Sequence, residues 1–375
     1  MPHLSGVSKR PSLVNFPIPF DHPYTVPTLL LTVSVSACLY YYLQASHASD
    51  LIEAVRLRDV SKRRHLKRHQ DRYASLKVER QYVNPFTEWK QVTWWETALH
   101  WLRRCKNKND LSACGSEEHD LPSVQKPAFE NSSGRRQSTC LITIEGLTIL
   151  TDPVFGDRTV DRFYGYPRLR PLPCSLEEIR SKLDVILISH DHFDHLDEQV
   201  VKQLGDTVTW YIPLGLAGWF RKRGVENVVE LDWWQEIHHK ERPEIAFACV
   251  PAMHESGLRT FFDRNRALCG DTGFVPELFQ AIGKAYAPFI LAAIPIGNST
   301  SDEAIKHMHM TPAEAVQAHH LLGRPHLSIG IHWGTFLTCT RNEHRNTARE
   351  LATAAQNDEH SRFITTDLGE TVTLD

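Results

Sequence analysis

The residues with the clearest chemistry lie in the segment His190-Asp191-His192-Phe193-Asp194-His195, just after the apolar run from Val185 to Ile188. Imidazole and carboxylate groups together are ligands for zinc and similar borderline metal ions. Side chains two positions apart on extended backbone point to the same side, so His190 and His192 could bind one ion. Asp194 and His195 follow after the chain has begun to turn, which aims them at a neighbouring position. The segment predicts two metal ions at the end of a buried strand.

Two metal ions need more ligands than one loop supplies, because zinc usually takes four. Three later segments each combine a short apolar run with a candidate ligand: Ile245 to Pro251 with His254, Ala267 to Cys269 with Asp271, and Leu327 to Ile331 with His332. Strand ends meet at one edge of a sheet, so we expect these side chains to converge. Asp271 lies between glycines that allow a tight turn, and its two carboxylate oxygens could bridge both ions. One such residue alone would more often be structural, but the whole set favours a metal site.

The elements around these residues predict an α/β layering. Short apolar runs at 147–150, 185–189, 207–212 and 289–294 alternate with helical segments at 214–222, 276–285 and 346–357. Asp197 is the expected N-cap of a helix from Glu198 to Leu204. The segment Thr311-Pro312-Ala313-Glu314 is a capping box with proline at the first helical position, and it predicts a helix to Leu322.

Several motifs resemble one known family. They are Thr151-Asp152-Pro153-Val154-Phe155, Gly270-Asp271-Thr272-Gly273, Ala292-Ala293-Ile294-Pro295-Ile296-Gly297, Thr311-Pro312-Ala313-Glu314-Ala315 and Ile331-His332-Trp333-Gly334-Thr335. With the histidine segment they are similar to the N-acylphosphatidylethanolamine-hydrolysing phospholipase D family, including its fungal relatives, from about Thr139 to Phe336. The resemblance implies the α/β metallo-beta-lactamase fold, an αββα sandwich.

The resemblance also implies roles for individual residues. His190, His192 and His254 would bind a first zinc ion, Asp194, His195 and His332 a second, and Asp271 would bridge the two. His309 is expected at the substrate phosphate, and Met308 takes a position where the family often has a glutamine. The implied reaction converts N-acylphosphatidylethanolamine into N-acylethanolamine and phosphatidic acid, with Asp271 and His309 as catalytic residues. Asp152 is expected to form a turn or to support the ligands.

Two segments depart from the family pattern. Arg135 to Thr139 lacks the family's Gly-His-Ser/Thr-Thr motif, and the interval from His254 to Asp271 lacks an additional strand containing tryptophan. The short interval predicts either an exon missing from the sequence or the loss of an outer strand. The alternative functions are therefore a hydrolase of another ester or phosphoester, such as a lactone, and a catalytically impaired homologue that binds lipid.

The N-terminal third differs in kind. Val26 to Leu43 has no charged residue and ends in three tyrosines, which favour a membrane interface. We expect a single membrane-spanning segment, with a cleaved signal peptide or a buried helix as alternatives. Basic residues are more frequent after this segment than before it, which favours an endomembrane with the catalytic domain facing the cytosol. The fungal relatives suggest a mitochondrial membrane instead.

These observations divide the chain into five parts: an N-terminal tail (1–25), a transmembrane segment (26–43), a basic, tryptophan-rich juxtamembrane region (44–110), a polar linker (111–138) and the hydrolase domain (139–375). Trp94 to Leu102 predicts either an interfacial helix or one packed on the domain. The net charge of -3 predicts no nucleic-acid partner, and eight cysteines without a Cys-x-x-Cys pair predict reduced thiols. The expected partners are a phospholipid substrate and a membrane, and a homodimer is compatible with the sequence.

Overall fold

The computed structural model describes residues 22–78, 81–90, 122–128, 135–136, 138–159, 165–254, 271–297, 306–337, 341–356 and 362–374. The chain divides into two compact units, Met1–Val55 and Arg56–Asp375. Helix α1 (Thr25–Arg63) occupies the described part of the first unit and ends in the second. Its apolar part is unburied, and the helix is long and apolar enough to cross a membrane, a test that a signal sequence near an N-terminus also passes.

The larger sheet of the second unit has the strand order β3-β4-β5-β6-β7-β8. Its strands are β3 (Arg135–Arg136), β4 (Thr139–Ile144), β5 (Leu147–Thr151), β6 (Val185–Leu187), β7 (Thr209–Pro213) and β8 (Val228–Leu231). Strands β4 and β5 form a hairpin, whereas β5 to β8 are parallel. Parallel neighbours need crossover connections, and these carry α4 (Leu176–Ile179), α5 (Glu198–Leu204) and α6 (Ala217–Arg221).

The second sheet is parallel and contains β11 (Leu291–Pro295), β12 (Leu327–Ile331) and β13 (Phe363–Ile364). Its helices are α7 (Pro276–Tyr286), α8 (Pro312–Leu321) and α9 (Arg341–Ala355). Two antiparallel hairpins pair β1 (Leu76–Val78) with β2 (Gln81–Val83) and β9 (Glu236–His238) with β10 (Ala246–Ala248). The short helices are α2 (His69–Arg72), η2 (Arg180–Lys182), η3 (Gly205–Thr207) and η4 (Lys306–Met308).

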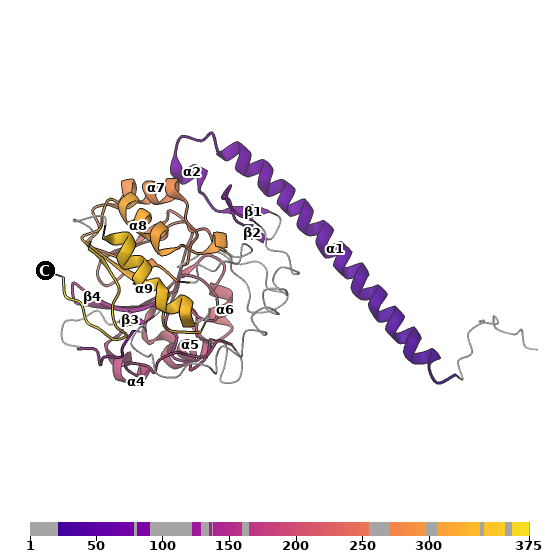
Figure 1. Ribbon diagram of the computed structural model, residues 1–375, viewed down its shortest axis with the longest axis horizontal. Helices are drawn as coiled ribbons and strands as arrows, with labels where there is room; N and C mark the ends of the chain where they lie inside the picture. The colour runs from indigo at the N-terminus through magenta and orange to yellow at the C-terminus, as the bar shows by residue number, and fades with distance from the viewer. Residues whose placement is uncertain are drawn as a thin grey trace, which may run out of the picture. The chain divides into compact units, whose positions relative to one another are not determined.

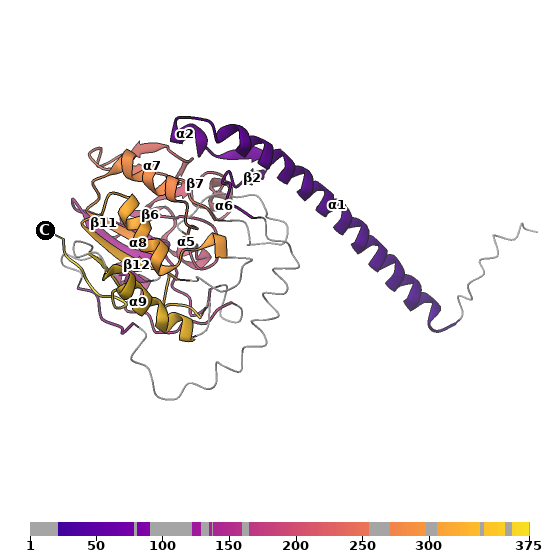
Figure 2. The same cartoon turned by 45° about the horizontal axis from the view of Figure 1, so that its top comes forward.

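Separate apolar cores lie on the outer sides of the two sheets. Ile186 and Trp210 of the larger sheet pack in one cluster with Val201 of α5 and Phe220 of α6. A second cluster joins the smaller sheet to α7, α8 and α9, and a third lies on the opposite face of the larger sheet. Figure 1 shows α4 and α5 at the opposite end of the unit from α7, and Figure 2 shows α8 and α9 beside β11 and β12. The expected αββα layering is confirmed.

The compact second unit includes segments that the sequence analysis assigned to the juxtamembrane region and the linker. Tyr73 and Phe86 are buried in the core of the smaller sheet. Val124 forms a parallel bridge with Leu368, and the neighbouring Ser123 hydrogen-bonds to Asp367. The hydrolase domain expected at 139–375 is therefore packed against earlier residues. The segment from Trp94 to Leu102 lies outside the described residues.

Candidate metal centre

The loop after β6 has the predicted local structure. β6 ends at Leu187, and the Asp197 side chain accepts a hydrogen bond from the Gln199 amide to cap α5, as expected. Between them, the His192 carbonyl accepts hydrogen bonds from the amides of His195 and Leu196, at 3.1 and 2.9 Å. This turn brings the second pair of candidate ligands beside the first, as predicted.

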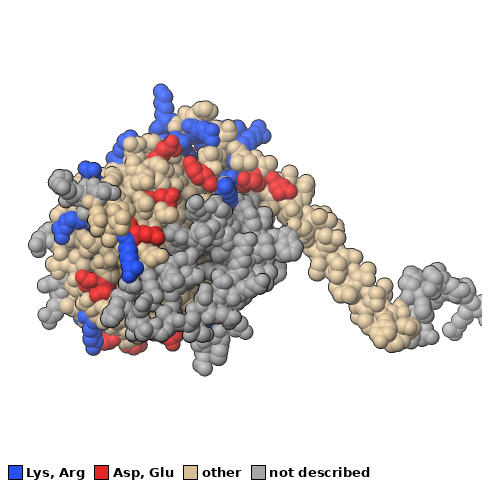
Figure 3. Space-filling model, viewed as in Figure 1, with Lys and Arg blue, Asp and Glu red and all other residues tan. Residues whose placement is uncertain are grey.

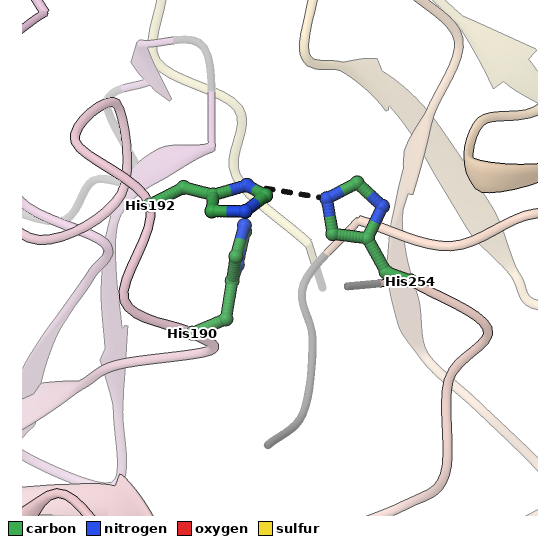
Figure 4. A group of neighbouring side chains, drawn as sticks. All are labelled: His190, His192 and His254. Atoms are coloured by element: carbon green, nitrogen blue, oxygen red, sulfur yellow. Dashed lines mark hydrogen bonds between the residues drawn. The ribbon is translucent and has the colours of Figure 1, made fainter. Parts of the chain in front are cut away.

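His190, His192 and His254 form the first group, in which one ring nitrogen of each residue lies within 4.8 Å of the others. His254 Nε2 is 3.3 Å from His192 Nδ1, and Figure 4 shows the His190 ring directed towards the His192 ring. Among the described residues, Nε2 of His190 and Nε2 of His192 have no hydrogen-bond partner although both atoms are buried. Buried lone pairs directed at one another in this way fit a bound cation.

Asp194, His195 and His332 form the second group by the same distance criterion. Asp194 Oδ2 is 3.5 Å from His332 Nε2 and 3.7 Å from His195 Nε2. His332 directly follows β12, as the sequence predicted, and has a φ of +62°. Few residues other than glycine adopt this left-handed conformation, although histidine does so more often than most.

Asp271 lies between the two groups. Its Oδ2 is 2.9 Å from His332 Nε2, 3.3 Å from His195 Nε2 and 3.9 Å from Nε2 of His254. Its Oδ1 is buried without a hydrogen-bond partner among the described residues. The carboxylate thus has the location that a bridging ligand requires.

Two hydrogen bonds between neighbouring segments bring Asp271 and His254 together, and the apolar run 267–269 expected before Asp271 lies outside the described residues. Strand β10 ends at Ala248, well before His254, and the described residues around Asp271 form no strand. The Met253 amide instead donates to the Thr272 hydroxyl, and the Gly273 amide donates to the Met253 carbonyl. These two hydrogen bonds join the segments side by side. The interval 255–270, with its predicted missing strand, lies outside the described residues.

His309 lies closer to the candidate ligands than the sequence suggested. Its Nδ1 is 4.0 Å from Asp271 Oδ2, and its ring centroid is 5.0 Å from that of His254 and 5.5 Å from that of His332. His254, Asp271 and His309 themselves form a candidate metal group. The buried Met308 faces the site through its backbone, because its carbonyl lies 2.9 Å from His254 Nδ1.

A hydrogen-bond network behind the ligands involves Asp152 and Ser189. Asp152 Oδ2 is 2.9 Å from His195 Nδ1, and the same carboxylate accepts hydrogen bonds from the amide and hydroxyl of Ser189. The Ser189 hydroxyl is also 3.0 Å from His190 Nδ1. Asp152 therefore supports the candidate ligands, which is one of the two roles predicted for it; the other was to form a turn. Sequence reasoning missed Ser189, although it directly precedes the histidine segment.

Two glycines allow close backbone contacts around the site. A Cβ atom at Gly297 would lie 1.8 Å from the His332 carbonyl oxygen, and one at Gly273 would lie 1.8 Å from the His307 carbonyl oxygen. Real Cβ contacts are never this short, so any side chain would displace these backbones. Gly273 thus allows its backbone to approach that of His307 closely.

Burial and charge divide the histidines into two sets. Burial lowers the pKa of His192 to about 4 and that of His254 to about 3, so both are neutral at pH 7. Burial also opposes the charge on His332, but the carboxylates of Asp271 and Asp194 outweigh it and raise the pKa of His332 to about 9. Metal binding displaces protons from its ligands. A cation at this site would replace the proton on His332, which the two carboxylates stabilise.

The residues fit a pair of metal ions by three observations. Two groups of buried side chains direct ligand atoms at one another, a carboxylate lies between the groups, and several of the ligand atoms lack other partners among the described residues. Imidazole with carboxylate suits zinc, iron and other borderline ions. The buried clusters are consistent with a binuclear metal site.

Comparisons of structure support the same fold. An isothiocyanate hydrolase from Delia radicum gut bacteria matches with a TM-score of 0.50 and 18% identity, covering 65% of this chain and 99% of that chain. A possible metal-dependent hydrolase from Veillonella parvula DSM 2008 matches with a TM-score of 0.51 and 16% identity, covering 66% and 100%. Residues 148–333 match the beta-lactamase superfamily domain. The fold and the histidine and aspartate clusters define a metal-dependent hydrolase of the beta-lactamase superfamily.

Within the superfamily, this chain belongs to the metallo-beta-lactamase family that includes the N-acyl-phosphatidylethanolamine-hydrolyzing phospholipases D. It is 38% identical over 261 residues to N-acyl-phosphatidylethanolamine-hydrolyzing phospholipase D 1 of Caenorhabditis elegans, covering 62% of this chain and 72% of the worm protein. The mitochondrial protein of that activity from Saccharomyces cerevisiae is 33% identical over 263 residues, covering 64% and 54%. The worm protein is the more similar of the two, so these comparisons do not single out the fungal members.

Proposed function

We propose that this chain is a zinc-dependent phosphodiesterase of the phospholipase D type, which hydrolyses N-acylphosphatidylethanolamine to N-acylethanolamine and phosphatidic acid. The observation that supports this most strongly is the pair of candidate ligand groups around Asp271, in a chain 38% identical to a worm protein named for that reaction. The choice of zinc rests on the ligand types, since imidazole and carboxylate together suit this ion.

In the proposed site, His190, His192 and His254 would hold one zinc ion, Asp194, His195 and His332 would hold the other, and Asp271 lies between the two groups. Zinc at these positions would polarise the phosphate oxygens and lower the pKa of water. The chain's own contribution is orientation: Asp152 holds the His195 ring through Nδ1, which leaves Nε2 directed at Asp271.

His309 is the proposed substrate-binding histidine. It lies beside Asp271 on the loop before α8, and its side chain is 10% exposed, so it can contact a bound molecule at the site. A ring nitrogen of His309 would donate a hydrogen bond to a phosphate oxygen or to the leaving oxygen. Met308 belongs to the same proposed contact region, although its backbone carbonyl already accepts from His254 Nδ1.

The test is to incubate the purified chain with N-acylphosphatidylethanolamine and identify the products by mass spectrometry. N-acylethanolamine with phosphatidic acid is expected. Free fatty acid or diacylglycerol would assign the chain to another hydrolase class. A zinc-loaded, folded chain without turnover would favour the catalytically impaired homologue.

The same proposal places the enzyme on a membrane by α1, with Val26 to Leu43 as the span. Exposed Lys62, Arg64, Lys67 and Arg68 follow this apolar segment, and Figure 3 shows basic side chains interspersed with acidic ones around α2 and the adjoining end of α1. A mitochondrial membrane is proposed from the name of the yeast relative. Deleting residues 1–45 should move the chain to the soluble fraction, because the deleted part contains the whole span. Persistent membrane association would assign the anchor to another segment.

A further inference from the structure

Residues 84–89 contact the metal centre although they lie outside the superfamily match at 148–333. The side-chain amide of Asn84 donates a hydrogen bond to the His254 backbone carbonyl, at 2.9 Å. The Trp89 ring packs edge-on against His307, with ring centroids 4.9 Å apart, and His307 is two residues from His309. An N-terminal segment is therefore part of the surroundings of the first candidate metal group.

Arg56 holds this segment in place. Its side chain is almost completely buried, at 2% exposure, and Nη1 donates to the carbonyls of Asn84 and Phe86 at 3.0 and 2.8 Å. Nη2 donates to the Trp89 carbonyl at 3.5 Å. A buried guanidinium is costly unless it has acceptors, so the loop that supplies these carbonyls and Arg56 stabilise each other.

His254 needs such support because no strand extends to it. β10 ends at Ala248, and two hydrogen bonds fix the residue from different sides. One joins His254 Nδ1 to the Met308 carbonyl, and the other joins the His254 carbonyl to Asn84. The first sets the plane of the ring, and the second sets the backbone from which the ring projects towards His192.

We propose that Asn84 is a positioning residue for His254, and that Arg56 acts through Asn84. The N-terminal segment then supports the first metal group, whose three candidate ligands all lie within the superfamily match. The proposal rests on the metal occupancy given under Proposed function but is independent of the substrate. Residues that orient a metal ligand typically change metal affinity by about 10- to 100-fold, and an effect at the lower end is expected here because the contact is to the backbone.

The test measures Zn²⁺ binding by the full-length, detergent-solubilised chain in competition with a chelator. Asn84→Ala should lower the affinity for one of the two ions by about tenfold and leave the affinity for the other near its wild-type value. Asn84→Asp replaces the donor by an oxygen that faces the His254 carbonyl. This variant should lower the affinity for the same ion further. The visible spectrum of the Co²⁺-loaded chain should change in both variants, because it reports the ligand geometry directly.

Ser75→Ala is the matched control. The Ser75 hydroxyl also joins the N-terminal segment to the domain, at 2.8 Å from Asp232, but through a residue outside the candidate ligands. It should leave both affinities and the cobalt spectrum unchanged. Wild-type binding and spectra in Asn84→Ala, or an equal loss in Ser75→Ala, would overturn the proposal even if the melting temperature fell. Absence of metal binding by the wild-type chain would instead refute the proposed function.

The role of Arg56 is tested by a double-mutant cycle. If Arg56 acts through Asn84, Arg56→Met combined with Asn84→Ala should lower the affinity for the ion no more than the more damaging of the two single substitutions. Additive losses would show that Arg56 acts by another route. Should Arg56→Met fail to fold, Arg56→Lys, which keeps the charge but offers fewer donors, replaces it in the cycle.

Discussion

Replacing Asp152 by asparagine should disable one metal group through the tautomer of a histidine. Asp152 Oδ2 is 2.9 Å from His195 Nδ1, and this carboxylate can only accept, so Nδ1 carries the proton and Nε2 keeps its lone pair. In Asp152→Asn, the Oδ1 atom can still accept from the Ser189 amide, which leaves NH₂ facing Nδ1. That amide donates, which moves the proton to Nε2, where it blocks metal binding.

The expected loss of metal affinity can be estimated because the substitution preserves the fold. Asp152 has a φ of +38°, a conformation that asparagine also tolerates, and the side chains are nearly isosteric, so the fold should survive. Loss of such a supporting partner costs about 10- to 100-fold in metal affinity, or about 1.4 to 2.7 kcal/mol. Chelator competition with Zn²⁺ should show the affinity for one ion lowered by this factor and the affinity for the other nearly unchanged.

Asp184→Asn is a suitable control, because Asp184 also accepts a backbone hydrogen bond, from Thr148 at 2.7 Å, but at an exposed position away from the ligands. It should bind both ions like the wild-type chain. Two wild-type affinities in Asp152→Asn would refute the argument, since the His195 tautomer would then have no influence on the site. Equal weakening of both ions would also contradict it.

Three further outcomes are expected. Gly297→Ala should destabilise the chain by about 1 to 3 kcal/mol in thermal unfolding and lower metal content, because its Cβ would meet the His332 carbonyl at 1.8 Å; an unchanged melting temperature would contradict this. Asp271→Asn should abolish hydrolysis and lower zinc content in elemental analysis, whereas full activity with two zinc ions would exclude a bridging role. The metal-free chain should be most stable near pH 6.5 to 7 in calorimetry, and a rise in stability on either side would refute the last expectation.

The sign of that pH dependence follows from two opposite shifts. The pKa values of His192 and His254 are lowered to about 4 and about 3, so below pH 6.5 the unfolded chain binds more protons and stability falls with acidification. The pKa of His332 is raised to about 9, so its contribution is complete below pH 6.5 and is lost as pH rises to 9. Each group changes the unfolding free energy by at most about 1.4 kcal/mol per pH unit in its window.

Local features of this chain were predictable from the sequence because their causes are local. The Asp197 cap of α5 and the capping box at Thr311 depend on hydrogen bonds within a few residues, and both are present. His332 follows β12 because an apolar run ends there. The two groupings of candidate ligands could be inferred from the spacing of the histidine segment and a family resemblance, and the structure brings the same residues together.

Tertiary packing alone decided what surrounds these ligands. Asp152 reaches His195 across 43 positions, and Asn84 reaches His254 across 170. Neither pairing leaves a signal in local spacing, because each depends on how the sheets and the N-terminal segment are packed. The same holds for Asp271, whose segment joins that of His254 through the hydrogen bonds of Met253 with Thr272 and Gly273. Residue types and spacing predicted the metal chemistry, whereas the orientation of each ligand is set by contacts that exist only in the folded chain.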